Sequence, residues 1–353
     1  MSSKYWSDFV EQLDPYVPGE QPKVQGLIKL NTNESPYPPS PKVLEVLTDE
    51  AINLLRLYPD PNNSLLKGAV ADFYRVSEDN VCVGNGSDEI LAFAFQALFK
   101  QRLPILFPDI TYGFYTVYCG LFGIEYAELP LTDDFSINLS DYQRDNGGVI
   151  FANPNAPTGI GKSLESIEAF LQSNTESVVI VDEAYVDFGG ESAASLIGRY
   201  PNLLVVQTLS KSRSLAGSRV GFALGDKILI EALTKVKNSF NPYSVDRLAE
   251  VAAAAAIDDV AYFEQCCEKI INTREWLSDQ LVTLGFEVLP SQTNFVMAKP
   301  TLMSAQELFT QLRERKILVR FFKLPRIDEF LRISIGSDDE ISELVAALEE
   351  ILA

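Results

Sequence analysis

Residues 178–211 read VVIVDEAYVDFGGESAASLIGRYPNLLVVQTLSK, and this stretch decides the fold. It contains two apolar runs, Val178–Val181 and Leu203–Gln207, each of the length of a single strand. Such continuous runs are typical of parallel strands that helices cover on both faces. Asp182 ends the first run, and Lys211 follows the second. Because ligands bind at the carboxyl ends of strands in open α/β sheets, we expect both residues at one site.

Similar runs alternate with helical patterns from about residue 40 onward. This alternation predicts an α/β fold with a mainly parallel sheet. The further strands are expected at Ile105–Phe107, Glu125–Leu129, Val149–Ala152 and Val220–Leu224. Helices are expected at Pro41–Leu55, with Ser40 as the N-cap, and at Leu65–Tyr74, Asp88–Phe99 and Leu164–Gln172.

The pattern changes after Asn241-Pro242, which predicts a second, smaller α/β domain. Long helices at Asp246–Ile257 and Val260–Leu284 precede expected strands near Phe286–Leu289, Asn294–Ala298, Ile317–Val319 and Leu331–Ile335, and a last helix from about Asp338. We therefore expect an N-terminal arm at 1–40 that packs on the small domain, a large domain at 41–245 and a small domain at 246–353.

The composition excludes several classes of function. The 353 residues contain 29 Lys and Arg against 49 Asp and Glu, a net charge of −20, which argues against nucleic-acid or anionic-membrane binding. There is no histidine, so imidazole cannot serve as a metal ligand or as a general base, and we expect no metal site. The four cysteines lack metal spacing and the N-terminus lacks a secretion-signal pattern, which together favour a cytoplasmic protein.

Two stretches resemble phosphate-binding motifs of other protein classes. Residues 84–89, GNGSDE, begin like a dinucleotide-binding motif, but Glu89 replaces its third glycine. Residues 156–163, APTGIGKS, miss a P-loop only at the first glycine, and Lys162 would then act with Asp182 in a nucleoside-triphosphatase. That alternative leaves Tyr185, Lys211 and Arg219 without a role.

A different interpretation uses Asn153–Gly159, Asp182 with Tyr185, Ser210-Lys211 and Arg219 together. A buried carboxylate such as Asp182 needs a cationic partner, and a protonated pyridine nitrogen would be one. Lys211 can form a Schiff base with an aldehyde, which is how pyridoxal phosphate is anchored. Its phosphate would lie against Ser210, Arg219 and the backbone N–H groups of the helix that Ser87 and Asp88 open.

These residues resemble the fold-type I, class II pyridoxal-phosphate-dependent aminotransferases and, within them, the histidinol-phosphate aminotransferase family. The resemblance covers nearly the whole chain. It is carried by Leu13–Tyr16, Leu30–Glu34, Tyr58–Asp60, Gly86–Glu89, Thr111-Tyr112, Pro154–Gly159, Asp182–Tyr185, Thr208–Lys211, Gly217–Arg219 and Leu331–Gly336.

The resemblance implies a role for each cofactor-binding residue. Lys211 would form the Schiff base and shuttle protons, Asp182 would pair with the pyridine nitrogen, and Tyr185 would bond the ring's phenolic oxygen. Tyr112 would stack on the ring, or else pack in the core. The phosphate would be bound by Ser87, Asp88, Ser210 and Arg219, with Tyr58 reaching over from a second subunit, which implies a homodimer.

Two positions depart from the family pattern. Family members usually carry Asn immediately before Pro-Thr-Gly to bond the phenolic oxygen, whereas this chain has Ala156. We expect Asn155 to take that role, with Asn153 or Tyr185 alone as the alternatives. Arg213 follows the lysine closely, and we expect it to be a solvated or ion-paired surface residue.

The resemblance also implies the substrates. Arg332 resembles the arginine that binds an α-carboxylate, and Arg320 and Tyr16 match positions that hold a substrate phosphate. The expected reaction moves an amino group between L-histidinol phosphate and 2-oxoglutarate, giving imidazole-acetol phosphate and glutamate, in histidine biosynthesis. An aromatic aminotransferase and a threonine-phosphate decarboxylase are alternatives on the same scaffold. A regulatory protein that only senses pyridoxal phosphate would normally bring a DNA-binding domain, and the chain has no basic N-terminal segment.

Overall fold

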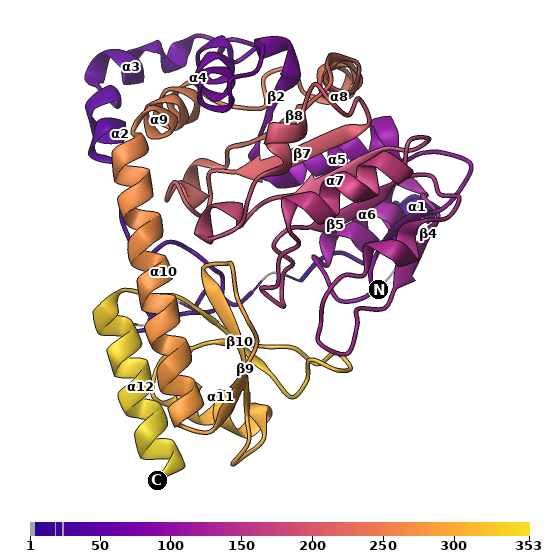
Figure 1. Ribbon diagram of the computed structural model, residues 1–353. Coiled ribbons are helices and arrows are strands. Elements are labelled where there is room, and N and C mark those ends of the chain that lie inside the picture. The colour runs from indigo at the N-terminus through magenta and orange to yellow at the C-terminus, as the bar shows by residue number, and fades with distance from the viewer. Residues whose placement is uncertain (1–3, 18, 23–24) are drawn as a thin grey trace.

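The computed structural model describes residues 4–17, 19–22 and 25–353. A sheet with the strand order β2-β8-β7-β6-β5-β3-β4 forms its centre, and helices cover both faces of this sheet (Figure 1). The strands are β2 (Val81–Gly84), β3 (Ile105–Pro108), β4 (Tyr126–Leu129), β5 (Val149–Ala152), β6 (Val179–Asp182), β7 (Leu203–Thr208) and β8 (Gly221–Gly225). The helices beside it are α4 (Ser64–Tyr74), α5 (Gly86–Leu98), α6 (Phe114–Phe122), α7 (Leu164–Ser173) and α8 (Lys227–Phe240).

The strand directions confirm the predicted α/β fold with a mainly parallel sheet. Strands β3 to β7 pair in parallel, whereas β8 runs antiparallel to both β7 and β2. Parallel pairing brings Asp182 at the end of β6 beside Val206 of β7, and the chain continues from β7 into Lys211. The two residues that the apolar runs singled out therefore share one edge of the sheet.

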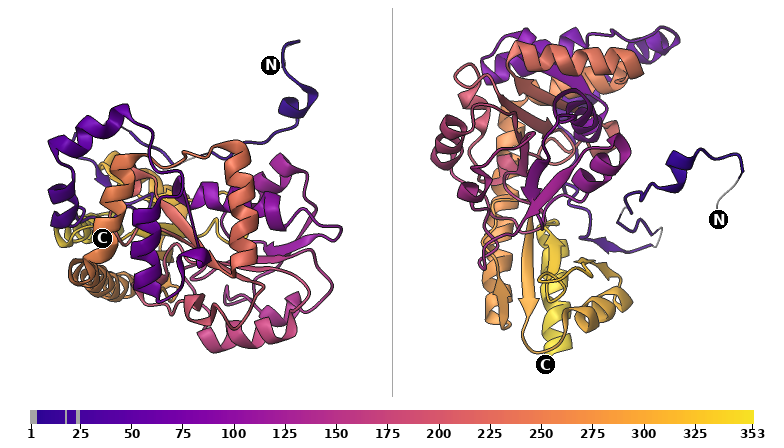
Figure 2. Two further views of the ribbon diagram at one scale, coloured as in Figure 1. Left: turned by 90° about the horizontal axis from the view of Figure 1, so that it is seen from above. Right: turned by 90° about the vertical axis from the view of Figure 1, so that its right-hand side faces the viewer.

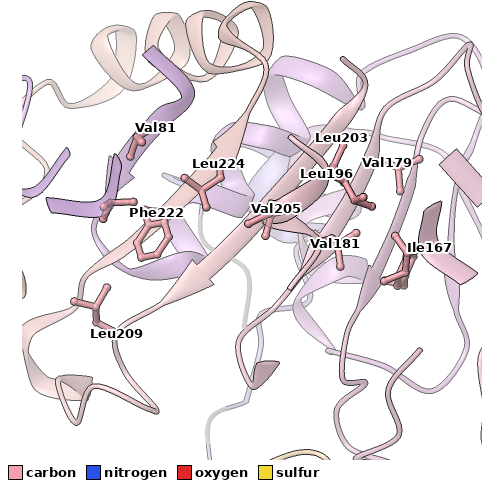
Figure 3. Packing of buried hydrophobic residues seen from close by; sticks show 14 of the residues in the cluster. Val81, Ile167, Val179, Val181, Leu196, Leu203, Val205, Leu209, Phe222 and Leu224 are labelled. Carbon is pink, nitrogen blue, oxygen red and sulfur yellow. The ribbon is translucent and has the colours of Figure 1, made fainter. Parts of the chain in front are cut away.

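Both faces of the central sheet are buried, which explains the continuous apolar runs. Val179, Val181, Leu203 and Val205 point to one face, where they pack with Phe222 and Leu224 of β8 (Figure 3). Ile180, Leu204 and Val206 point to the opposite face, against α5 and α8. Burying each such side chain contributes about 1.5–3 kcal/mol before the entropy of ordering is subtracted.

One predicted helix is wrong as a single element. The segment expected at Pro41–Leu55 forms α2 (Pro41–Val46), α3 (Asp49–Asn53) and the short 3₁₀ helix η1 (Leu54–Arg56). Ser40 caps α2 as expected, but Thr48 starts a second helix because its hydroxyl accepts the Ala51 N–H. A Thr that caps a new helix competes with continuation of the old one.

A second, antiparallel sheet has the order β12-β13-β10-β9 and its own hydrophobic core. Helix α10 (Val260–Thr283) runs from the top of the molecule down to this sheet (Figure 1). After α10 the chain forms β9 (Phe286–Val288), β10 (Phe295–Pro300), α11 (Ala305–Glu314), β11 (Ile317–Leu318), β12 (Arg320–Phe321), β13 (Leu331–Ser334) and α12 (Asp338–Leu352).

Helix α9 (Arg247–Asp258) packs against α2 and α4, and its Ala253 and Ile257 belong to the core of the large sheet. The expected boundary at 246 assigns this helix to the small domain. The division at 40 and 246 stays a prediction. Because α9 packs on the large domain, we propose that the second boundary lies after α9, so that the small domain begins with α10.

Among the described residues, the N-terminal segment contacts the small domain through Glu20, which forms an ion pair with Arg313 of α11, and through residues 28–30. Strand β1 (Ile28–Lys29) pairs in parallel with β11, and Leu30 is buried in the small domain's core. Helix α1 (Asp8–Glu11) buries none of its residues and stands away from the body (Figure 2). Among the helices of the described residues, none combines the length and apolarity that crossing a membrane requires.

Candidate active site

A cavity of about 620 Å³ opens at the carboxyl edge of the central sheet. Its walls come from the large sheet, from residues 31–33 and from the small domain. It brings together most of the predicted site residues, namely Tyr16, Ser87, Asp88, Tyr112, Asp182, Tyr185, Ser210, Lys211, Arg219, Arg320 and Arg332. Asn155 and Tyr58 do not line it in this chain.

Asp182 lacks one hydrogen-bond partner at the bottom of this cavity. The side chain is buried, and its Oδ2 accepts the Tyr115 hydroxyl at 2.8 Å. Its Oδ1 is also buried and accepts no hydrogen bond of good geometry among the described residues, although the backbone N–H of Ala184 lies close enough to lower the pKa of this carboxyl. Burial raises the pKa of Asp182 to about 6, although the hydrogen bond from Tyr115 opposes this rise. The carboxylate is therefore suited to a cationic N–H donor that enters the cavity.

Lys211 lines the cavity together with Ser210 of the same loop. Its Nζ donates to the Thr32 carbonyl at 3.1 Å and lies 5.8 Å from the centre of the Tyr185 ring. The Ser212 hydroxyl is bound to Asp187 at 2.5 Å, and the hydroxyls of Ser214 and Ser35 lie 2.9 Å apart. These anchors hold the loop while the lysine side chain keeps access to ligands.

The expectation that Arg213 lies at the surface is wrong. Its side chain is buried, and its Nη1 donates to the carbonyls of Ala256 at 2.7 Å and Ile257 at 3.3 Å, in the last turn of α9. The guanidinium also lies 3.5 Å from the centre of the Phe263 ring, on α10. Arg213 thus ties the Lys211 loop to the α9–α10 junction.

An anion-binding cup forms where α5 begins. The helix starts at Gly86, which has a φ of +79°, and the next two residues, Ser87 and Asp88, line the cavity. Arg219 lies opposite, with Nη2 3.0 Å from Asp88 Oδ2 and Nη1 3.2 Å from Ser210 Oγ. A helix N-terminus, an arginine and a hydroxyl together form a site for phosphate.

The cup depends on a glycine in the neighbouring strand. A Cβ atom on Gly221 of β8 would lie only 2.3 Å from the backbone nitrogen of Ser87. The bare backbone therefore lets β8 pass directly beneath the first turn of α5. Arg219 lies two residues before Gly221 and has a φ of +50°.

Tyr112 and Tyr185, two of the three tyrosines that line the cavity, lie in different environments. Tyr112 donates its hydroxyl to Asp88 Oδ1 at 2.7 Å, and burial together with this carboxylate raises its pKa. Its ring packs partly against Tyr115 and Phe114. Tyr185 accepts a hydrogen bond from Asn33 Nδ2 at 2.9 Å. The sequence pattern assigned no individual role to Asn33.

The structure does not bring Asn155 to the cavity. Its Nδ2 donates to the Ile110 carbonyl at 2.9 Å and to Thr158, while its Oδ1 accepts the Thr111 hydroxyl at 2.8 Å. Asn153 is equally occupied, because its Oδ1 accepts the backbone N–H of Lys162. Ala156 itself lines the cavity, so no amide of this loop faces it.

Arg332 and Arg320 extend from the small domain into the opposite wall of the cavity. Arg332 Nη2 donates to the Asn31 carbonyl at 2.9 Å, but its buried Nε has no partner among the described residues. Burial lowers the pKa of Arg332. Tyr16 reaches the same wall and stacks on Phe114, with ring centres 4.3 Å apart. This wall is cationic and fits an anionic ligand.

Tyr58 lies outside the cavity of its own chain. Its side chain is 79% exposed, and its ring stacks on Tyr243 at 4.8 Å. Lys162 also lies outside the cavity that contains Asp182, so the two residues of the P-loop alternative do not meet there.

The residues that sequence reasoning missed are Tyr115 and Asn33. Tyr115 lies in the first turn of α6, which is crowded with aromatic residues, and nothing in the sequence marks one tyrosine there as the partner of Asp182. Asn33 lies within the matched stretch Leu30–Glu34, but its partners Ser334 and Tyr185 are far away in sequence.

The chain matches the family "Aminotransferase class I and II" over residues 25–348. It belongs to this family. This membership excludes the P-loop alternative and agrees with the geometry of the cavity. The fold likewise agrees with a solved structure, that of histidinol-phosphate aminotransferase from Sinorhizobium meliloti in complex with pyridoxal-5'-phosphate. That structure has a TM-score of 0.88 and 25% identity, covering 99% of this chain and 98% of that one.

Within the family, the similar curated proteins share one activity in their names. Histidinol-phosphate aminotransferase 1 of Hydrogenovibrio crunogenus is 61% identical over 99% of this chain and 98% of its own. Histidinol-phosphate aminotransferase 2 of Dechloromonas aromatica is 62% identical over 99% of both chains.

Proposed function

We propose that this protein transfers an amino group between L-histidinol phosphate and 2-oxoglutarate, giving imidazole-acetol phosphate and glutamate, in histidine biosynthesis. The observation that carries this function is that Lys211 and Asp182, whose buried Oδ1 accepts no hydrogen bond of good geometry, line the same cavity. Relatives with identities of 61% and 62%, both histidinol-phosphate aminotransferases, support the choice of substrate.

Pyridoxal phosphate fits the residues of this cavity. The orphaned Asp182 Oδ1 suits its pyridinium N–H, and the cup at Gly86, Ser210 and Arg219 suits its phosphate. Lys211 would hold it covalently, and Tyr185 would contact its phenolic oxygen. When bound, this cofactor withdraws electrons from the substrate's Cα, so that a proton there becomes removable.

Lys211 is the base that removes and returns this proton. Its Nζ lies in the cavity, next to the Thr32 carbonyl, and it is the only lysine among the cavity's lining residues in the described part of the chain. Asp182 would supply the negative charge that holds a proton on the pyridine nitrogen. The buried surroundings of Asp182 exclude water and strengthen this attraction.

The two arginines bind the anionic ends of the substrates. Histidinol phosphate carries a phosphate but no carboxylate, whereas 2-oxoglutarate carries two carboxylates. Arg332 and Arg320 lie in one wall, where a guanidinium can bind either anion through paired hydrogen bonds. Tyr16 closes this wall from the N-terminal segment.

The active unit that we propose is a homodimer in the cytoplasm. Helices α2 and α3 and the following segment expose Leu44, Ile52, Leu55 and Tyr58, and α1 exposes Phe9 and Val10. Apolar surface of this kind supports an interface between copies of the chain. All four cysteines are free and buried, which is compatible with a reducing compartment.

The test uses purified protein loaded with pyridoxal phosphate. Lys211→Ala should abolish amino transfer from histidinol phosphate, whereas Lys162→Ala, in the motif that resembles a P-loop, should leave it nearly unchanged. Single-turnover rates should be measured with histidinol phosphate, phenylalanine and threonine phosphate. Equal rates for phenylalanine and histidinol phosphate would contradict the substrate, and CO₂ release from threonine phosphate would indicate the decarboxylase.

A further inference from the structure

Asn33 lies at a junction of three parts of the molecule. Its Nδ2 donates to the Tyr185 hydroxyl at 2.9 Å, and its Oδ1 accepts the Ser334 hydroxyl at 2.8 Å. Its backbone N–H donates to Ser334 Oγ at 2.9 Å, and its carbonyl accepts Asn294 Nδ2 at 3.0 Å. Both Asn33 and Ser334 are buried, so water cannot replace these bonds.

The count of protons fixes the orientation of the Asn33 amide. Ser334 Oγ already accepts the Asn33 backbone N–H, and its own proton goes to Asn33 Oδ1. With the amide turned over, Ser334 would accept twice and its buried proton would have no acceptor in this network. The observed orientation gives the buried Ser334 proton an acceptor and directs the NH₂ group of Asn33 at Tyr185.

This orientation decides what Tyr185 can do. A phenol oxygen that accepts from Asn33 keeps its own proton for another group. No acceptor for that proton lies within hydrogen-bond distance in the described part of the chain, and the Tyr185 side chain lines the cavity. Its ring is held edge-on by Phe295, with centres 5.2 Å apart.

We propose that Asn33 is a positioning residue that makes Tyr185 an obligate hydrogen-bond donor to the ligand in the cavity. This inference rests on the proposed function, in which that ligand is the phenolic oxygen of pyridoxal phosphate. Ala156, Asn155 and Asn153 offer no side-chain amide to the cavity. Of the residues expected to bond this oxygen, Tyr185 is therefore the one that can donate a proton to it. The cationic groups facing Tyr185 are Lys211 and Arg332.

The backbone of Asn33 makes a clean substitution possible. Its φ is +56°, a conformation that asparagine, aspartate and glycine tolerate better than other residues. Asn33→Gly removes the amide without backbone strain. Asn33→Asp keeps the shape but replaces the NH₂ donor by an oxygen, which attracts the Tyr185 proton away from the cavity. Ser334→Ala removes the partner that fixes the amide orientation.

The readout is the pH at which the absorbance of the cofactor-loaded enzyme changes, measured without substrate. A proton donated to the phenolic oxygen stabilises its negative charge and so weakens proton binding at the nitrogen that joins Lys211 to the cofactor. Losing that donor should raise the midpoint, by about one pH unit or more for Asn33→Asp and by less for Asn33→Gly and Ser334→Ala. Cofactor dissociation should accelerate in the same order.

A double-mutant cycle with Tyr185→Phe separates positioning from general damage. Because Asn33 acts through Tyr185, Asn33→Gly should add no further shift to the midpoint of Tyr185→Phe. Equal midpoints for wild type, Asn33→Gly and Asn33→Asp would overturn the inference, as would additive shifts in the cycle. If Asn33→Asp does not fold, Asn33→Gly and its cycle decide. A wild-type protein that takes up no pyridoxal phosphate would instead contradict the proposed function.

Discussion

Arg320 and Arg332 are paired directly across the ladder between β12 and β13. Like charges at such positions repel, and burial adds a cost for Arg332, whose pKa it lowers. Neither side chain forms an ion pair within the described residues. The pair therefore lowers the folding stability of the ligand-free protein and raises its affinity for anions.

Replacing Arg320 should separate stability from binding. Arg320→Met removes the repulsion but keeps an apolar stem on the strand, so the melting temperature of the ligand-free protein should stay equal or rise. The KM values for histidinol phosphate and 2-oxoglutarate should both rise by about tenfold or more, because a charged hydrogen bond is lost. Exposed Arg315, which bonds only its own helix, provides Arg315→Met as the control. A lower melting temperature with unchanged KM values would refute this account.

Asp182 should make the stability of the ligand-free protein depend on pH. Its folded-state pKa of about 6 exceeds the ordinary value of 3.8, so the folded protein binds this proton more tightly than the unfolded chain. Stability from this group is therefore present at low pH and is lost as the pH rises through about 6. Asp182→Asn should stabilise the ligand-free protein at pH 7.5 by up to about 3 kcal/mol, and by much less at pH 4.5.

Calorimetry of both proteins at the two pH values, without and with pyridoxal phosphate, measures this effect. The cofactor should stabilise wild type more than Asp182→Asn, because only the carboxylate attracts a pyridinium ion. An asparagine variant that is less stable than wild type at both pH values would contradict the assignment.

Gly221 should be required for the cofactor phosphate. Gly221→Ala places a Cβ 2.3 Å from the Ser87 nitrogen, so the first turn of α5 has to move. The affinity for pyridoxal phosphate should fall by about tenfold or more, as measured by titration of the apoprotein. Gly120→Ala is the matched control, because a Cβ there meets nothing within 4 Å and the residue lies inside helix α6. Equal affinities for both variants would exclude the steric explanation.

Arg213 should contribute mainly to stability. Arg213→Met leaves the last carbonyls of α9 without their charged donor and removes the stack on Phe263, which should cost about 3 kcal/mol in urea unfolding. Arg213→Lys keeps the charge but not the planar stack, and should recover part of that loss. Unchanged unfolding free energy in the methionine variant would show that these contacts contribute little.

Mixing two inactive variants should test the homodimer. Lys211→Ala lacks the base. We propose that Tyr58 of one subunit contacts the cofactor phosphate in the other subunit, and Tyr58→Ala should lack this contact. Random hybrids contain one intact site in half of the dimers, so mixing after mild dissociation should restore about a quarter of wild-type activity. Each variant mixed with itself is the control. If the mixture stays inactive although hybrids form, Tyr58 does not act across subunits.

Local patterns in the sequence predicted the elements that define the cavity. The apolar runs around β5, β6 and β7 located strands within about a residue, because both faces of the sheet are buried along their whole length. Parallel pairing then placed Asp182 and Lys211 at one edge. These inferences needed only periodicity and strand direction.

Long-range contacts were beyond such reasoning. The burial of Arg213 depends on the carbonyls of Ala256 and Ile257, which lie more than 40 residues further on. Asn155 looked available for the cavity, yet Thr111 and the Ile110 carbonyl occupy its amide. Strand β2 at Val81–Gly84 was not among the predicted strands, although it is as long as β3 and β5, which were predicted.

The bond between Asn33 and Ser334 also has a consequence for how the protein is made. The two residues are separated by 301 positions, so a ribosome has synthesised nearly the whole chain before this contact can form. Until then, Lys211 and Asp182 can already lie in a folded large domain, but the Tyr185 proton has no fixed direction. A nascent chain is thus kept from complete cofactor chemistry until its last strand has been added.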